Sequence, residues 1–157
     1  MEKTEIGWDE YHKCCLQLAE LVKENHENTN NIILIALSRG GLNPAIAVSN
    51  LLNMTFLSMG VRSYDKFDEQ KSFELYQVPA PVDFKRNQDI VIIDDLVDSG
   101  HTLKFVYKYL KDRGYVQNKI YTYVLYDKGI SVIGTPEFKY VQKIDPNKWV
   151  VFPYEKM

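Results

Sequence analysis

Apolar positions recur along this chain with two different spacings, and together the two spacings predict its class of fold. Near the N-terminus they recur every three or four residues, which is the spacing of one helix face. These positions are Trp8, Tyr11, Cys15, Leu18 and Val22. We expect the aromatic members of this face to lie in the core. A continuous apolar run at 32–37 then predicts a strand that is buried on both faces, as in parallel sheets.

The rest of the chain repeats the alternation of helix and strand. Asn43 can cap, and Pro44 can open, a helix that runs to Leu52. A further helix is expected from Leu103 to Gly114, a residue type that suits the position after a helix end. Further strands are expected at 55–61, 90–93, 120–126, 140–144 and 149–152. This order predicts a single α/β domain over residues 1–157, with a central parallel sheet flanked by helices.

Residues 62–84 interrupt the pattern. They are rich in charge, contain Pro79 and Pro81, and alternate only weakly between apolar and polar positions. Proline is rare inside sheets because it cannot donate a backbone hydrogen bond. We therefore expect a flexible hairpin that leaves the sheet and contributes nothing to the core.

Composition limits the classes of function. A chain of 157 residues with 45% hydrophobic and 25% charged residues can form a core without disulfides. A net charge of −2 gives no bulk attraction to nucleic acid or to anionic membranes. Cys14 and Cys15 are neighbours without a distant partner, so reduced thiols and a cytoplasmic location are expected. The polar N-terminus predicts no signal peptide, and the longest apolar run is too short for a membrane span.

The most informative chemistry lies where the strand at 90–93 ends. Asp94 and Asp95 follow it directly, and Asp98 comes three residues later, before a Ser-Gly-x-Thr turn and a helix. Such a turn directs backbone N–H groups and small hydroxyls at one point, which suits a phosphate monoester. Carboxylates beside a phosphate require a sugar diol, a metal ion or a developing cation to offset the repulsion. Phosphoribosyl pyrophosphate bound with Mg²⁺ offers all three.

Two other motifs share part of this pattern. The sequence contains no G-x-x-x-x-G-K-[ST], which excludes a Walker loop. Asp94 to Asp98 also fits the DDxxD prenyl-diphosphate motif, but that motif lies on a helix and the residues at 90–93 favour a strand. A single Asp at a strand end would mean little, whereas three acids with this turn rarely coincide by accident.

Residues 91–103 closely resemble the signature of the type I phosphoribosyltransferases, and the resemblance extends over nearly the whole chain from Trp8 onward. It implies that Asp94 and Asp95 face the ribose hydroxyls and the metal, with Asp95 as the Mg²⁺ contact. The 5′-phosphate would bind the turn that follows. Its residues are Asp98, Ser99, Gly100, His101 and Thr102. His101 stands where the family varies and is expected to contribute its backbone N–H alone.

Two more segments match the family. Arg39 offers a fork of donors and Gly40 a close backbone approach, which matches the pyrophosphate loop of the purine phosphoribosyltransferases. Ser63-Tyr64-Asp65 resembles the start of the family's flexible loop, so 62–84 would be a lid that excludes water. Lys71 is either the cation that this lid brings to pyrophosphate or a solvated loop residue.

The C-terminal part resembles the xanthine–guanine and hypoxanthine–guanine branch of the family. There Lys128 would donate to the purine 6-oxo group, Trp149 would stack on the ring, and the backbone of Val150 would read its edge. Glu155 stands where the family usually has Asp, near the purine 2-substituent or a second metal ion. Residues 140–157 would thus form a small hood over the base.

The expected function is Mg²⁺-dependent transfer of phosphoribose from phosphoribosyl pyrophosphate to guanine, xanthine or hypoxanthine, a purine salvage reaction. Asp98 would either accept a proton from the purine or steady the ribosyl cation, so Asp98 and Lys128 are the expected catalytic residues. The alternatives are a transferase for another nucleobase and a non-catalytic regulator that binds phosphoribosyl pyrophosphate. The resemblance also implies a homodimer or homotetramer, and no nucleic acid partner is expected.

Overall fold

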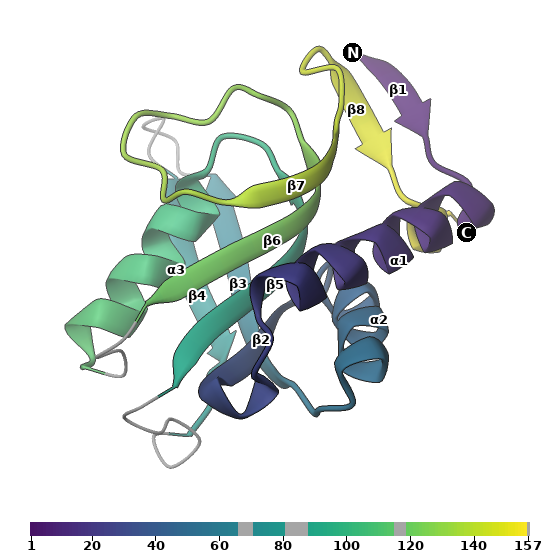
Figure 1. Cartoon of the computed structure of the whole chain (residues 1–157). Helices are drawn as coiled ribbons and strands as arrows, with labels where there is room; N and C mark the ends of the chain where they lie inside the picture. The colour runs from purple at the N-terminus through teal and green to yellow at the C-terminus, as the bar shows by residue number, and fades with distance from the viewer. Residues whose placement is uncertain (66–70, 81–87, 115–118, 157) are drawn as a thin grey trace.

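The protein is described by a computed structural model, which covers residues 1–65, 71–80, 88–114 and 119–156 (Figure 1). In chain order the elements are β1 (Glu2–Glu5), α1 (Trp8–Asn25), the short 3₁₀ helix η1 (Thr29–Asn31), β2 (Ile32–Ser38), α2 (Leu42–Leu52), β3 (Leu57–Asp65), β4 (Lys71–Gln77), β5 (Asp89–Val97), α3 (His101–Asp112), β6 (Ile120–Asp127), β7 (Lys139–Lys143), β8 (Lys148–Val151) and the 3₁₀ helix η3 (Pro153–Glu155).

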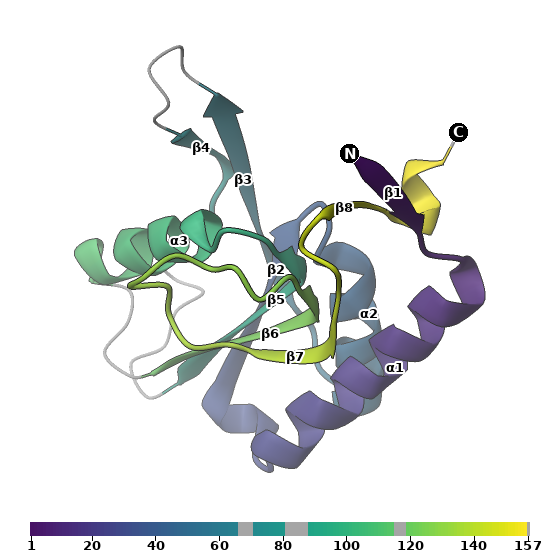
Figure 2. The ribbon, with the colours of Figure 1, turned by 90° about the horizontal axis from the view of Figure 1, so that it is seen from above.

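A six-stranded sheet forms the centre of the molecule, in the order β4-β3-β2-β5-β6-β7. Its strands pair in parallel, except that β4 runs antiparallel to β3. Helices α1 and α2 cover one face and α3 covers the other (Figures 1 and 2). This arrangement confirms the predicted α/β fold with a central, mostly parallel sheet between helices.

The alternation of side chains along β2 divides the core in two. Ile32, Leu34 and Ala36 pack with α1 and α2, whereas Ile33 and its alternate neighbours pack with α3. Because both faces are covered, this central strand can be apolar along its length, as its sequence predicts.

Two local predictions are wrong on the helices. Helix α2 begins at Leu42, with Gly41 at the capping position, so Asn43 does not cap it and Pro44 lies inside the first turn. Trp8 is 60% exposed, while Tyr11 is buried. Trp8 is the first residue of α1, at the end that extends past the sheet (Figure 2), where its ring makes an edge-to-face contact with Tyr11.

The segment expected to leave the sheet is, in its described residues, an antiparallel hairpin of β3 and β4, and β4 forms the edge strand of the six-stranded sheet. The residues at 66–70 and 81–87 lie outside the described part, and the lid role stays a prediction. The hairpin does contribute to the core, contrary to expectation. Leu75 packs against the cluster under α3, and the Phe73 ring stacks on Phe105 at 5.1 Å.

The C-terminal strand also differs from prediction. Strand β8 does not extend the central sheet but pairs in parallel with β1, in a separate two-stranded sheet. The strand β1 has the sequence Glu-Lys-Thr-Glu, which carries no apolar pattern from which a strand could be predicted. Its pairing brings the N-terminal strand alongside the C-terminal strand, beside the central sheet (Figure 1).

Candidate active site

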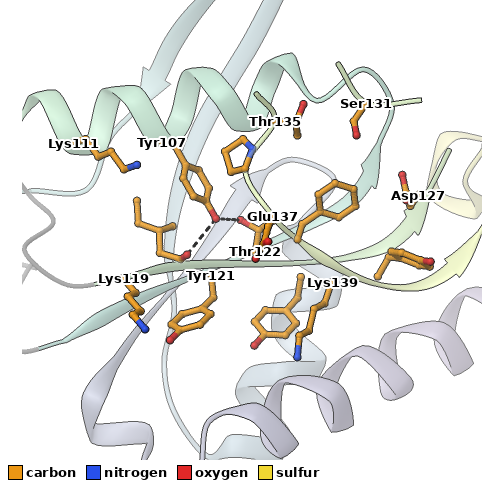
Figure 3. Close-up of a pocket in the computed structure, with 15 residues that line it drawn as sticks. Tyr107, Lys111, Lys119, Tyr121, Thr122, Asp127, Ser131, Thr135, Glu137 and Lys139 are labelled. Carbon is orange, nitrogen blue, oxygen red and sulfur yellow. Dashed lines mark hydrogen bonds between the residues drawn. The ribbon is translucent and has the colours of Figure 1, made fainter. Parts of the chain in front are cut away.

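The hollows beside the central strands differ in whether they contain the predicted residues. A cavity of about 910 Å³ lies at the outer edge of β6, under the loop that leads to β7 (Figure 3). It lies beside the hydrogen bond between the hydroxyls of Tyr107 and Thr122, at 2.8 Å. None of the predicted site residues lines this cavity.

Another hollow opens between the carboxyl ends of β2 and β5. From β2 the chain crosses through α2 on one face, and from β5 it crosses through α3 on the other, so the strand order reverses here. Ligands in open α/β sheets bind at such a switch point. The pocket has a volume of about 320 Å³. The predicted residues that line it are Asp94, Asp95, Asp98, Thr102, Lys128, Trp149, Val150 and Glu155.

The register of β5 explains how the acids enter this pocket. Pairing with β2 ends at Ala36 opposite Ile93, whereas pairing with β6 continues to Val97. Asp94 and Asp95 therefore lie on a part of β5 that is still paired with β6 but no longer paired with β2. The strand expected at 90–93 thus extends through both acids.

The two acids are partly buried, and their desolvation raises the pKa of both. For Asp94 the charge of Asp95 raises the pKa further, and one carboxylate oxygen of Asp94 accepts from the Asp95 N–H at 2.9 Å. For Asp95 a hydrogen bond from the Tyr154 hydroxyl, at 2.7 Å, acts in the opposite direction. Such a pair suits a ligand that brings positive charge or hydroxyl donors.

The loop after β2 lies directly against Asp95. A Cβ on Gly40 would lie 2.1 Å from the Asp95 carboxylate, so only glycine fits there. The peptide bond between Ser38 and Arg39 is cis. Arg39 and Gly40 line a second, larger hollow of about 1360 Å³ that adjoins the pocket and shares Asp95 with it.

This larger hollow also contains Arg62, Tyr76 and Tyr154, which were not among the predicted site residues. Arg62 lies on β3, with its guanidinium 5.2 Å from the centre of the Tyr76 ring. The Tyr76 hydroxyl donates to the carbonyl of Ser38 at 3.2 Å, and Tyr154 reaches Asp95. The position of Arg62 directly before Ser63-Tyr64 was an available signal, whereas nothing in the sequence pairs Tyr76 or Tyr154 with the site.

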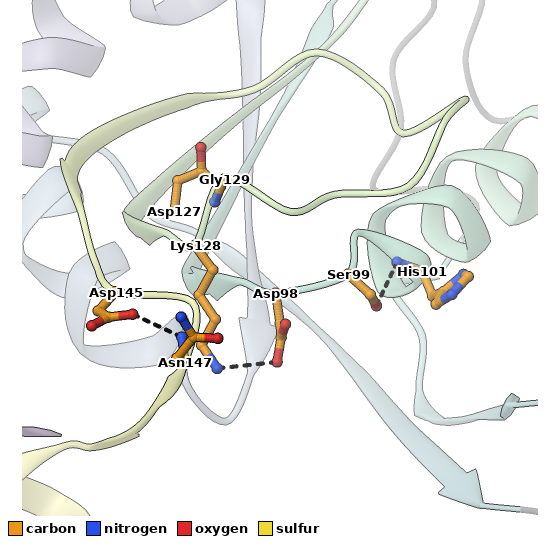
Figure 4. Close-up of polar contacts among 8 residues, drawn as sticks. All are labelled: Asp98, Ser99, His101, Asp127, Lys128, Gly129, Asp145 and Asn147. Carbon is orange, nitrogen blue, oxygen red and sulfur yellow. Dashed lines mark hydrogen bonds and ion pairs between the residues drawn. The ribbon is translucent and has the colours of Figure 1, made fainter. Parts of the chain in front are cut away.

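The turn between β5 and α3 has the geometry of an anion-binding loop. Gly100 has a φ of 86°, and a Cβ there would lie 2.3 Å from the Thr135 hydroxyl oxygen. The Ser99 side chain accepts from the His101 N–H at 3.4 Å (Figure 4). Thr102 lines the pocket, but the imidazole of His101 points away from it, into a separate hollow beside α3.

Lys128 follows the end of β6 and reaches back across the pocket. Its side chain is only 5% exposed, and its ammonium lies 3.4 Å from a carboxylate oxygen of Asp98, which is half-exposed (Figure 4). The backbone N–H of Lys128 donates to Val97 at 3.1 Å, which fixes this residue to the end of β5. One buried cation and one accessible anion therefore face the same space.

The C-terminal segment closes the opposite side of the pocket. Trp149 is 58% exposed, Val150 is buried, and both line the pocket. One carboxylate oxygen of Glu155 accepts from the Phe152 N–H at 2.9 Å and so fixes the turn η3. Glu155 therefore has a structural contact that the sequence did not indicate. The side chain of Lys71, the remaining candidate, lies outside the described part of the structure.

No helix in the described ranges is both long enough and apolar enough to cross a membrane.

Comparisons with known proteins agree with this geometry. The family model described as "Phosphoribosyl transferase domain" matches residues 7–155. The chain is 29% identical to a xanthine-guanine phosphoribosyltransferase of Idiomarina loihiensis, over 96% of this chain and 85% of the relative. It is 30% identical to the Gluconobacter oxydans protein of the same name, over 96% of this chain and 83% of the relative.

Solved structures give the same result. A purine phosphoribosyltransferase from Pyrococcus horikoshii superposes with a TM-score of 0.78 at 27% identity, covering 100% of this chain and 97% of the other. A Helicobacter pylori xanthine-guanine-hypoxanthine phosphoribosyltransferase, at 22% identity, shares the fold with a TM-score of 0.76, covering 98% of this chain and 94% of the other. The predicted family and the predicted kind of enzyme are confirmed. The chain belongs to the phosphoribosyl transferase domain family.

Proposed function

We propose that this protein transfers the 5-phosphoribosyl group of phosphoribosyl pyrophosphate to a 6-oxopurine, which gives the nucleoside 5′-monophosphate and pyrophosphate. The relatives named xanthine-guanine phosphoribosyltransferase support a purine as the acceptor. The observation that carries the proposal is the position of Lys128, Asp98 and Trp149 around one pocket at the switch point.

The sugar and its phosphates would occupy the strand-end side of the pocket. We assign the 5′-phosphate to the turn at 98–102, the ribose hydroxyls to Asp94 and Asp95, and pyrophosphate to Arg39 and Gly40. Arg62 lines the same hollow as Arg39 and is a second guanidinium for the leaving group. His101 would contribute through its backbone alone, since its imidazole points elsewhere.

Mg²⁺ is the expected cofactor, and the residues present fit it. The described residues contain no cluster of three or more potential ligands of the His, Cys, Asp or Glu type. Mg²⁺ does not require one, because it retains water and is held by one or two carboxylates and substrate phosphates. Asp95 is the first candidate ligand, and Glu155 has one carboxylate oxygen left beside its contact with Phe152. The bound ion would offset the negative charge of the departing pyrophosphate.

The base would lie between Lys128 and Trp149. An ammonium group can only donate, so Lys128 suits a 6-oxo acceptor and opposes the 6-amino group of adenine. Trp149 offers a stacking surface, and Val150 lines the same wall. Asp98 lies where it could accept the purine proton or steady the ribosyl cation as the C1′–O bond breaks and the purine nitrogen attacks. Positioning and charge stabilisation would supply most of the rate enhancement.

Pyrophosphate release tests the proposal directly. The protein is incubated with phosphoribosyl pyrophosphate, with and without Mg²⁺, against guanine, xanthine, hypoxanthine, adenine, uracil and orotate. Release with 6-oxopurines alone is expected, and it should stop when Mg²⁺ is chelated. A buried polar group left unpaired can discriminate by about 10⁴-fold, so adenine should be rejected to that degree.

A pair of lysine variants sharpens this assay. Lys128→Ala should abolish the preference for 6-oxopurines, whereas Lys108→Ala, which removes a surface ion pair with Asp112, should change nothing. Adenine as the best substrate would contradict the 6-oxopurine assignment. Binding of phosphoribosyl pyrophosphate without turnover of any base would favour the regulator instead.

The cellular setting is part of the proposal. Cys14 and Cys15 are both free and buried, which suits a reducing compartment such as the cytoplasm. The predicted homodimer or homotetramer has a possible contact surface in the exposed apolar side chains of α1 and α2, among them Leu16, Ile46 and Leu51.

A further inference from the structure

The C-terminal turn reaches the acid pair through one hydrogen bond. The hydroxyl of Tyr154, in η3, donates to a carboxylate oxygen of Asp95 at 2.7 Å, across 59 positions of sequence. Tyr154 lies in the hollow that contains Arg39 and Gly40, and it was not among the residues predicted from the sequence.

The position of this hydroxyl is fixed by the packing of its ring. The Tyr154 ring stacks on Phe152, with centroids 5.5 Å apart and planes within 3°. It also makes an edge-to-face contact with Tyr11, with centroids 5.8 Å apart. The turn itself is fixed by the Glu155 carboxylate, which accepts from the Phe152 N–H. The phenol therefore has little freedom to follow Asp95 if that side chain rotates.

The Asp95 carboxylate is also confined by the loop after β2. It lies against Gly40 so closely that a Cβ there would overlap it, while the Tyr154 hydroxyl occupies one of its oxygens. Among the described residues, Asp94 has no such contact from the C-terminal segment, and its oxygen accepts from the neighbouring backbone N–H. The two acids are thus fixed by different parts of the chain.

We propose that Tyr154 is a positioning residue, which holds the Asp95 carboxylate against Gly40 in the orientation that binds phosphoribosyl pyrophosphate. This inference rests on the proposed function, and it adds that the C-terminal segment orients a group on the sugar side of the pocket. Because a preset carboxylate loses less freedom when the substrate binds, removal of the hydroxyl weakens substrate binding.

The variant Tyr154→Phe tests this with the ring packing retained. A hydrogen bond to a charged group corresponds to about 10–100-fold in an equilibrium constant, so the KM for phosphoribosyl pyrophosphate should rise by that factor. The KM for the purine and kcat should each stay within about threefold, since the base side is untouched. The matched control is Tyr11→Phe, which removes a hydroxyl that has no hydrogen-bond partner among the described residues.

A double-mutant cycle separates positioning from a general loss of structure. If Tyr154 acts through Asp95, Tyr154→Phe should have no further effect on calorimetric binding of phosphoribosyl pyrophosphate when Asp95→Ala is present. Additive effects, or unchanged affinity in the single variant, would overturn the inference while the proposed function stands. Failure of the unmodified protein to bind phosphoribosyl pyrophosphate would instead refute the proposed function.

Discussion

The pocket has two walls that are fixed in different ways. The strand-end wall consists of residues 38–41 and 94–102, and most of its backbone belongs to the interior of the six-stranded sheet or adjoins it directly. The C-terminal wall consists of residues 148–155, whose strand β8 pairs with β1 and, within the described ranges, with no strand of that sheet. The first wall partly buries two carboxylates, and the second leaves Trp149 mostly exposed.

Under the proposed function, the two walls have different tasks: the strand-end wall holds charged groups, and the C-terminal wall stacks on the base. Fixed charges act best when they are preset, and the central sheet supplies the required rigidity even though burial disfavours the charged carboxylates. A stacking platform needs only a flat apolar surface, so a short peripheral strand is sufficient. The two walls should consequently respond differently to substitution, in both kinetics and stability.

The largest effect is expected at Asp98, where the strand-end wall meets Lys128. Asp98→Asn keeps the shape of the turn but removes a proton acceptor and a negative charge. General-base catalysis contributes about 10²–10⁴-fold, so kcat should fall by that factor. Steady-state kinetics with saturating substrates measures it, and calorimetry should show nearly unchanged affinity for phosphoribosyl pyrophosphate. Activity within twofold of the unmodified protein would refute both roles assigned to Asp98.

A smaller effect is expected on the C-terminal wall. Stacking on a base is worth about 1–3 kcal/mol, so Trp149→Ala should raise the KM of every purine substrate about 5–150-fold. The variant should keep its melting temperature, because the indole is mostly exposed. Trp8→Ala is the matched control, since Trp8 is also exposed but lies outside the pocket. An effect confined to one purine would show that Trp149 reads ring substituents and does not merely stack.

The strand-end wall was predictable because its information is local. An apolar run that ends in Asp94 and Asp95, followed by a glycine turn and a helix, specifies strand, loop and site within fourteen consecutive positions, 90–103. The continuous apolar run at 32–37 likewise predicted a strand buried on both faces. The sequence did not show that β5 continues through the acids. The end of β5 depends on its pairing with β6, which continues beyond the point where its pairing with β2 ends.

The C-terminal wall was less predictable because its contacts are long-range. Trp149 and Val150 were identified through the family resemblance, but the pairing of β8 with the polar strand β1 has no signal in either segment. The same holds for the contact between Tyr154 and Asp95. The prediction that Trp8 lies in the core was wrong. Periodicity identifies the apolar face of a helix, but it does not show where the sheet beneath that face ends.

Holding two carboxylates in the strand-end wall should lower the stability of the folded protein, and this effect can be measured. Asp94→Asn retains the acceptor for the Asp95 N–H but removes a buried charge, so the melting temperature near pH 7 should rise. Each kcal/mol corresponds to about 2–4 °C for a domain of this size. A raised pKa means that the folded state favours the protonated acid. The gain should therefore shrink as the pH falls and disappear below the ordinary carboxyl range. A gain independent of pH would show that the charge is not its cause.

The smallest effect is expected from the strand that supports the C-terminal wall. Removal of residues 1–5 deletes β1 and its parallel pairing with β8, but retains Ile6, whose N–H donates to Val151 at 3.0 Å. A few exposed backbone hydrogen bonds contribute modestly, so the purine KM should rise about threefold, with the KM for phosphoribosyl pyrophosphate unchanged. Kinetics with each substrate varied in turn distinguishes the two. Equal increases in both constants would mean that β1 supports the whole pocket, and that the two walls are not independent.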